Sequence, residues 1–157
     1  MNNAGHAAVG EKEEKKGSFV LTIILTVALA LFLRFFVFST IRVDGPSMQK
    51  TLYTNENILI EKVSYRFSDP KRFDVVVCKF EGQQDYFVKR IIGLAGETIE
   101  ITGGAIYIND EPLAGDVHAN GITPHEMEKM KIPEGTYFLM GDNRQNSMDS
   151  VSLGVVP

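Results

Sequence analysis

The sequence has very little cysteine: Cys78 is the only one in 157 residues. An intrachain disulfide is therefore excluded. Cys78 lies within the apolar run 73–78, which favours a small buried strand residue over a reactive thiol. The histidines His6, His118 and His125 lie elsewhere in the chain, so the sequence does not indicate a Cys-His pair.

The chain also lacks a strong net charge and any recognisable metal-ligand spacing. The formal net charge is −4 and no basic face stands out, which argues against nucleic acid as a partner. No group of Cys, His, Asp and Glu has the spacing of a metal site, and no cofactor is implied. Repeats and low-complexity segments are absent, so the length favours one compact domain plus extensions.

What the sequence does have is one long apolar run, residues 18–38, with Arg34 as its single charge. As a helix rising ~1.5 Å per residue, it is about 30 Å long, which matches the hydrocarbon core of a bilayer. The run is longer than a typical signal-peptide core, and no Ala-X-Ala-like cleavage site follows it. We therefore predict a transmembrane helix at 18–38, in preference to a cleavable signal peptide or a buried core helix.

The segments on either side of this run predict the orientation. Residues 1–17 are polar and predict a disordered tail. Lys12, Lys15 and Lys16 precede the run, so the positive-inside rule places the tail in the cytoplasm. A single pass through the cell membrane then leaves residues 39–157 as an extracytoplasmic domain.

Beyond residue 40 the patterns are those of β-structure. Short runs rich in β-branched and aromatic residues, separated by Gly, Asn and Asp, predict strands at 57–63, 73–80, 85–92, 98–101, 105–108 and 136–140. The pair Gly103-Gly104 predicts a tight hairpin. Thr123 to Glu126 resembles a helix start, with room for a short turn of helix at most. The predicted fold is mostly β.

Two residues in this domain are candidates for a nucleophile and a general base. Ser47 follows Gly45-Pro46, and a serine nucleophile needs a base within hydrogen-bond reach. Lys89 lies in a predicted strand, where Phe87 and Ile91 share its face. Burial among apolar side chains disfavours the charged form of a lysine, so Lys89 is a candidate general base. Each signal alone is weak, because most serines after Gly-Pro are turn residues and most strand lysines are solvated.

A third segment, residues 141–150, is strongly polar and follows a hydrophobic strand. A calcium loop does not fit, because Arg144 stands where an oxygen ligand is expected and no acidic twelfth position follows. We expect the side chains of this segment to bond its own backbone and to orient a neighbouring group.

Together the segments 45–52, 86–97 and 141–150 resemble the three sequence boxes of type I signal peptidases, the bacterial Ser-Lys leader peptidases. The stretch between the second and third boxes is short, which is similar to the Gram-positive enzymes of this family. The resemblance covers about residues 18–155. It implies a β-barrel-like catalytic domain with a small β-hairpin accessory region at about 98–135.

The resemblance also implies an activity and a set of roles. Signal peptides of exported preproteins would be cleaved after small residues, with the substrate bound as an extended strand on a sheet edge. Ser47 would be the nucleophile, its N–H an oxyanion donor, and Lys89 the general base. Ser147 would orient the lysine amine and Asp149 would support it.

Asp142 and Arg144 match scaffold positions of the same loop, but the chain departs from the family pattern elsewhere. Lys50 stands where a proline is usual, and Val151 replaces a usual arginine. Gly45 stands where Gram-negative-type enzymes of the family have a serine hydroxyl in the oxyanion hole, so the sequence does not identify the second oxyanion donor. Family members usually continue past residue 157, so the resemblance implies either a naturally short chain or a truncated one.

Other readings remain open. A specialised peptidase acting on pilin-like proteins would use the same chemistry. A catalytically impaired homologue serving as a binding or assembly factor would keep the fold but not the activity. A repressor-type autoprotease fits less well, because a membrane helix replaces the DNA-binding module.

Overall fold

The computed structural model describes the backbone of residues 4–157 and the side chains of residues 18–157. The chain divides into two compact units. One comprises Met1–Thr40 and Leu59–Ser64, and the other comprises Ile41–Ile58 and Tyr65–Pro157. Every residue predicted to carry chemistry belongs to the second unit.

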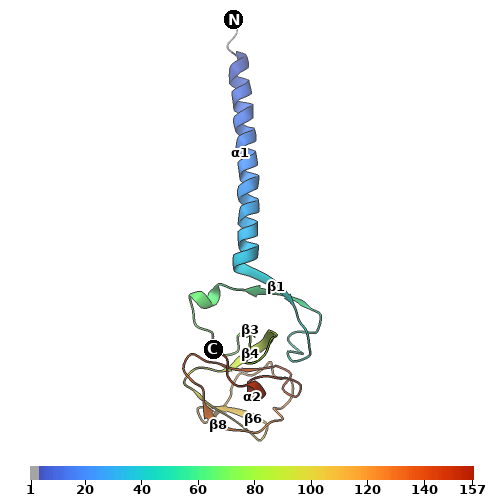
Figure 1. The fold of residues 1–157 in the computed structure, drawn as a ribbon, viewed down its shortest axis with the longest axis vertical. Helices are drawn as coiled ribbons and strands as arrows, with labels where there is room; N and C mark the ends of the chain where they lie inside the picture. The colour runs from blue at the N-terminus through green and yellow to red at the C-terminus, as the bar shows by residue number, and fades with distance from the viewer. Residues whose placement is uncertain (1–3) are drawn as a thin grey trace. The chain divides into compact units, whose positions relative to one another are not determined.

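The first unit contains a long helix, α1 (Ala4–Phe32), drawn in blue in Figure 1. A π-helical turn, η1 (Leu33–Val37), continues it. The segment Ser18–Val37 is long and apolar enough to cross a membrane, and none of it is buried. The sequence predicted a disordered tail over residues 1–17, whereas α1 already begins at Ala4; the alanines, glutamates and lysines of this segment have high helix propensity. Residues 1–3 lie outside the described part of the chain.

Short strands make up most of the remaining secondary structure. They are β1 (Phe38–Arg42), β2 (Asn57–Glu61), β3 (Val75–Cys78), β4 (Phe87–Gly93), β5 (Thr98–Thr102), β6 (Ala105–Ile108), β7 (Glu111–Pro112), β8 (Met127–Lys131) and β9 (Phe138–Met140). A 3-10 turn, η2 (Ser64–Arg66), and a short helix, α2 (Ser150–Leu153), complete the list. The sheets have the orders β1-β2, β3-β4-β9 and β7-β6-β5-β8. The mostly β prediction is confirmed, although the described strands form three sheets and no closed barrel.

All six predicted strands are present within a few residues of their expected bounds. The strands β1, β7 and β8 and the helix α2 were not predicted. The helix start expected at Thr123 was wrong: the segment is irregular, and Glu126 Oε1 accepts a hydrogen bond from the Gly103 N–H at 3.0 Å. The Glu126 carboxylate, which a capping box would direct to its own helix start, therefore accepts a hydrogen bond from the β5–β6 hairpin turn instead.

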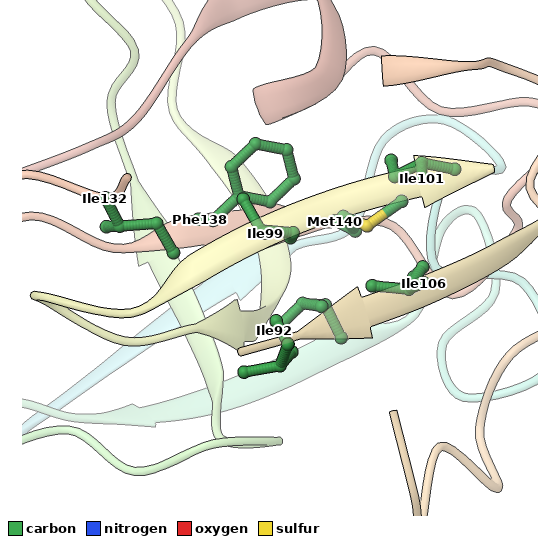
Figure 2. Close-up of a cluster of buried hydrophobic side chains, with 8 residues drawn as sticks. Ile92, Ile99, Ile101, Ile106, Ile132, Phe138 and Met140 are labelled. Carbon is green, nitrogen blue, oxygen red and sulfur yellow. The ribbon is translucent and has the colours of Figure 1, made fainter. Parts of the chain in front are cut away.

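Two hydrophobic cores lie on the two faces of β4. The first core contains Ile92 together with side chains of β5, β6, β9 and the following loops: Ile99, Ile101, Ile106, Ile108, Ile132, Phe138 and Met140. Figure 2 shows most of these side chains converging between the strands. The second core contains Ile91 with Cys78, Phe80, Leu139 and Val156. Since side chains alternate along a strand, β4 presents Lys89 on the face of Ile91 and Arg90 on the face of Ile92.

Candidate active site

Ser47 lies in a tight turn that is bonded to the third sequence segment. Gly45, at φ +90°, allows the chain to enter this turn, and the side chain of Met48 anchors it with only 1% of its surface exposed. The Ser47 carbonyl accepts a hydrogen bond from the Asn143 N–H at 3.0 Å, and Asn143 Nδ2 donates to the Pro46 carbonyl at 3.2 Å. The half-buried Ser47 is thus fixed through its backbone, and its hydroxyl has no hydrogen-bond partner among the described residues.

Lys89 is buried in the middle of the sheet, with 1% of its surface exposed. Its strand β4 pairs with β3 on one side and β9 on the other. The amine Nζ donates to Ser147 Oγ at 3.2 Å and lies 5.7 Å from the centre of the Phe87 ring. Burial lowers the pKa of Lys89, and the negative charge of Asp149 opposes that shift. An amine in this position loses its proton more readily than a solvated lysine and can act as a base.

Gly141 is the point where the three segments meet. A Cβ atom at this position would lie 2.3 Å from Ser147 Oγ and 2.4 Å from the Ser47 carbonyl oxygen. Only glycine therefore permits this close approach. The contacts form a continuous path from the backbone of Ser47 through Gly141 to Ser147 and on to the amine of Lys89.

Asp149 fixes both ends of the third segment. Its Oδ2 accepts from the Gly141 N–H at 3.0 Å, and its Oδ1 accepts from the Val151 N–H at 3.2 Å, which caps α2. Val151, where the family pattern has arginine, packs against the first core instead of making an ion pair. Asp149 therefore acts on Lys89 through its charge and on Gly141 through a hydrogen bond.

Asp142 is fully buried and is neutralised by Arg90, a residue that the sequence analysis did not single out. Arg90 Nε and Nη2 each lie 2.7 Å from the carboxylate oxygens of Asp142, and Nη1 donates to the Phe73 carbonyl at 2.7 Å. The Thr51 hydroxyl also donates to Asp142. This cluster joins the serine, lysine and loop segments. The signal for it was the pair of adjacent basic residues 89 and 90 within an otherwise apolar strand.

Arg144, the other predicted scaffold residue, is buried beside the same loop. Its Nε donates to the Gly141 carbonyl at 3.0 Å, and its Nη2 lies 2.6 Å from Asp116 Oδ2. Asp116 comes from the predicted accessory region and was also missed, because nothing in its local sequence marks it.

The remaining chemistry-bearing groups do not add to the site. Among residues 18–157, no cluster of His, Cys, Asp and Glu could hold a metal ion. Cys78 is buried, and burial raises its pKa to about 11, which suits a packing residue rather than a nucleophile.

Fold and site together define a β-rich protein with an apolar helix near its N-terminus and a buried lysine, Lys89, whose amine is hydrogen-bonded to Ser147. The family model described as "Signal peptidase, peptidase S26" matches residues 16–157. The chain belongs to this family and is a serine protease, and its membership supports removal of signal peptides as its activity. With its N-terminal apolar helix, it is a membrane-anchored protein.

The chain is also similar to individual signal peptidases. The chain is 36% identical over 146 residues to the signal peptidase I of Leptolyngbya laminosa, spanning 88% of this chain and 71% of the relative. It is 38% identical to a probable signal peptidase I-2 of Synechocystis, spanning 87% of this chain and 65% of the relative. It is 38% identical to a signal peptidase I of Bacillus amyloliquefaciens, spanning 89% and 81%. A crystal structure of a signal peptidase I from Enterococcus faecalis matches 57% of this chain and 90% of its own, with 32% identity and a TM-score of 0.47.

Proposed function

We propose that this protein cleaves signal peptides from exported preproteins, with Ser47 as nucleophile and Lys89 as general base. The observation that carries the proposal is the buried Lys89 amine, which lies within hydrogen-bond distance of Ser147, in a site that shares Gly141 with the backbone of Ser47. Because burial lowers the pKa of Lys89, its amine is available as a base at a lower pH than the amine of a solvated lysine.

The proposed reaction begins when Ser47 Oγ attacks the scissile carbonyl carbon and its proton passes to Lys89 Nζ. The oxyanion is stabilised by the Ser47 N–H, and the protonated lysine returns the proton to the leaving amine. Water then hydrolyses the acyl-enzyme by the same proton transfers. Lys89 Nζ donates a hydrogen bond to Ser147; the proposed reaction requires it to reach Ser47 Oγ, and catalytic hydrogen bonds often form only in the substrate complex.

Substrate recognition and topology are part of the same proposal. The substrate binds as an extended strand on a sheet edge, with small residues such as Ala at positions −1 and −3. The N-terminus lies in the cytoplasm, and the domain that follows the span lies outside, where translocated preproteins emerge.

The test is cleavage of a purified preprotein by the detergent-solubilised full chain, with the cut located by mass spectrometry. Ser47→Ala and Lys89→Ala should each reduce the rate by about a thousandfold or more, because neither half of the dyad works alone. Lys79→Ala, at an exposed position one residue past β3, is the matched control and should cleave at the wild-type rate.

The outcomes separate the competing functions. Equal cleavage by wild type and both site variants would refute the dyad. An inert wild type that still binds signal peptides would indicate a binding or assembly factor. Cleavage confined to pilin-like precursors within a mixed panel of preproteins would indicate the specialised peptidase.

A further inference from the structure

The segment 113–123, between β7 and β8, links the sheet β7-β6-β5-β8, which forms most of the predicted accessory region, to the candidate active site. Both ends are bonded to the β5–β6 hairpin: the Leu113 N–H donates to the Ile106 carbonyl at 2.8 Å, and the Thr123 N–H donates to the Gly104 carbonyl at 3.3 Å. Between these attachments the chain reaches the third sequence segment. The Asn120 N–H donates to the Asp142 carbonyl at 2.6 Å.

The second link is the ion pair between Asp116 and Arg144. Only 13% of the Asp116 side chain and 3% of the Arg144 side chain are exposed. By contrast, the accessory pair Asp110–Lys129 is 69% and 45% exposed. Exposed pairs contribute little, whereas removing one partner of a buried pair leaves an uncompensated charge in the protein interior. Of these two acids, Asp116 is therefore the one whose replacement should disturb the structure beyond its immediate neighbours.

Arg144 carries the effect of Asp116 to the reacting groups. Its Nε holds the Gly141 carbonyl, and Gly141 lies against both Ser47 and Ser147. The carboxylate of Asp116 lies 2.6 Å from Arg144 Nη2 without the alignment of a hydrogen bond, so it holds the buried guanidinium by charge, while Nε keeps its hydrogen bond to the Gly141 peptide. Without the carboxylate, the Arg144 side chain can turn toward water. The Gly141 carbonyl then loses its hydrogen bond from Arg144 Nε.

We propose that Asp116 is a positioning residue, which holds Arg144 and through it the Gly141 peptide, so that the accessory region sets the geometry between Ser47 and the Lys89–Ser147 pair. The inference rests on the proposed function. Asp116 acts on the alignment of the reacting atoms and not on substrate contacts. Its loss should therefore lower kcat and leave KM unchanged.

The experiment compares Asp116→Asn with the matched control Asp110→Asn in the detergent-solubilised full chain. Asp116→Asn should lower kcat by about 10-fold, because small displacements of reacting groups are costly. Its KM should stay within about two-fold of wild type, and Asp110→Asn should match wild type in both constants. Asp116→Glu, which keeps the charge, should recover part of the lost kcat. An unchanged kcat in Asp116→Asn, or a loss confined to KM, would overturn the proposal.

A double-variant cycle tests whether Asp116 works through Arg144. The double variant Asp116→Asn, Arg144→Gln should have the same kcat as Arg144→Gln alone, since the intermediary is already lost. Losses that multiply would mean that the two residues act independently, and would contradict the proposal.

Hydrogen–deuterium exchange gives a reading that does not depend on activity. Exchange of the backbone amides of residues 141–146 should accelerate about 10-fold in Asp116→Asn and stay unchanged in Asp110→Asn. Unaltered exchange would overturn the inference even if the wild type were inert. Full cleavage by Ser47→Ala would instead defeat the proposed function, so the two failures are distinguishable.

Discussion

Lys89 and Arg90 are adjacent basic residues of the same strand, both buried, yet their surroundings differ in almost every respect. Arg90 faces the carboxylate of Asp142, with two contacts of 2.7 Å, and also donates to a backbone carbonyl. Lys89, on the opposite face, has the hydroxyl of Ser147 at 3.2 Å and the ring of Phe87.

The difference shows how one strand can carry both scaffold and chemistry. A buried cation that is fully paired stays charged and holds structure, and its removal leaves an unpaired anion. A buried amine that no carboxylate contacts directly is biased toward its neutral form, which is the form that can take a proton. The alternation of the strand separates the two environments by a single residue.

The largest expected effects come from replacing each residue by methionine, which keeps length but removes charge. Lys89→Met should abolish cleavage while leaving the free energy of unfolding unchanged or slightly higher, since a buried amine is lost. Arg90→Met should destabilise the protein by about 3–5 kcal/mol, because the buried carboxylate of Asp142 is left without a compensating cation. Thermal unfolding in detergent and cleavage assays would measure both.

Arg90→Met combined with Asp142→Leu serves as the control. Removing both charges should recover most of the lost stability, since no unpaired ion remains. If Lys89→Met proved as destabilising as Arg90→Met, the division into a reactive face and a scaffold face would be wrong.

Gly141→Ala tests the place where the two faces are tied together. The added methyl would overlap Ser147 Oγ and the Ser47 carbonyl, so the loop must move away from the site. We expect a loss of about 100-fold in kcat with a cost of about 1–3 kcal/mol in stability. Gly135 has φ +72°, which strains any added side chain, but its Cβ would meet nothing within 4 Å. Gly135→Ala should therefore lower the stability without lowering kcat, and it is the control for a loss of stability alone. Wild-type kcat in Gly141→Ala would contradict the close approach.

Much of this division could be predicted from the sequence, but not all of it. Alternation alone put Lys89 and Arg90 on opposite faces, and β-branched runs located the central strands. The strand β8 was missed because its sequence, Met127–Lys131, holds three charged residues and no β-branched one. Its pairing with β5 is tertiary in origin.

The candidate site shows the same limit. Ser47, Lys89 and the segment 141–150 were chosen from sequence, and the structure brings their segments together. The partners Arg90 and Asp116 could not be assigned, because an ion pair across 52 or 28 residues depends on how loops pack, and local sequence does not encode that.

A smaller effect is expected in the pH dependence of cleavage. Burial lowers the pKa of Lys89 and the charge of Asp149 raises it, so the rate of the wild type should rise with pH as Lys89 deprotonates. In Asp149→Asn the pKa of Lys89 should fall further, and the rising limb should move to lower pH. The plateau rate should drop as well, because one acceptor for the backbone of Gly141 or Val151 is lost.

The pH–rate profile of kcat/KM measures this shift. The carboxylate of Asp110 pairs with the exposed Lys129, so Asp110→Asn should not shift the pH–rate profile. A limb that moves to higher pH in Asp149→Asn would mean that the carboxylate does not act on Lys89 by its charge.

The smallest effect concerns Lys50, a lysine three residues from Ser47 but exposed to solvent. If burial and not closeness in sequence makes a lysine reactive, Lys50→Gly should leave the pH–rate profile unchanged. Lys50 has φ +94°, a strained conformation for any residue but glycine, so Lys50→Gly should raise the stability by about 1 kcal/mol. Lys50→Pro, which introduces the residue usual in the family pattern, should lower the stability, because the proline ring fixes φ near −65°. A stabilising proline would mean that the turn after Ser47 adopts the ordinary family conformation instead.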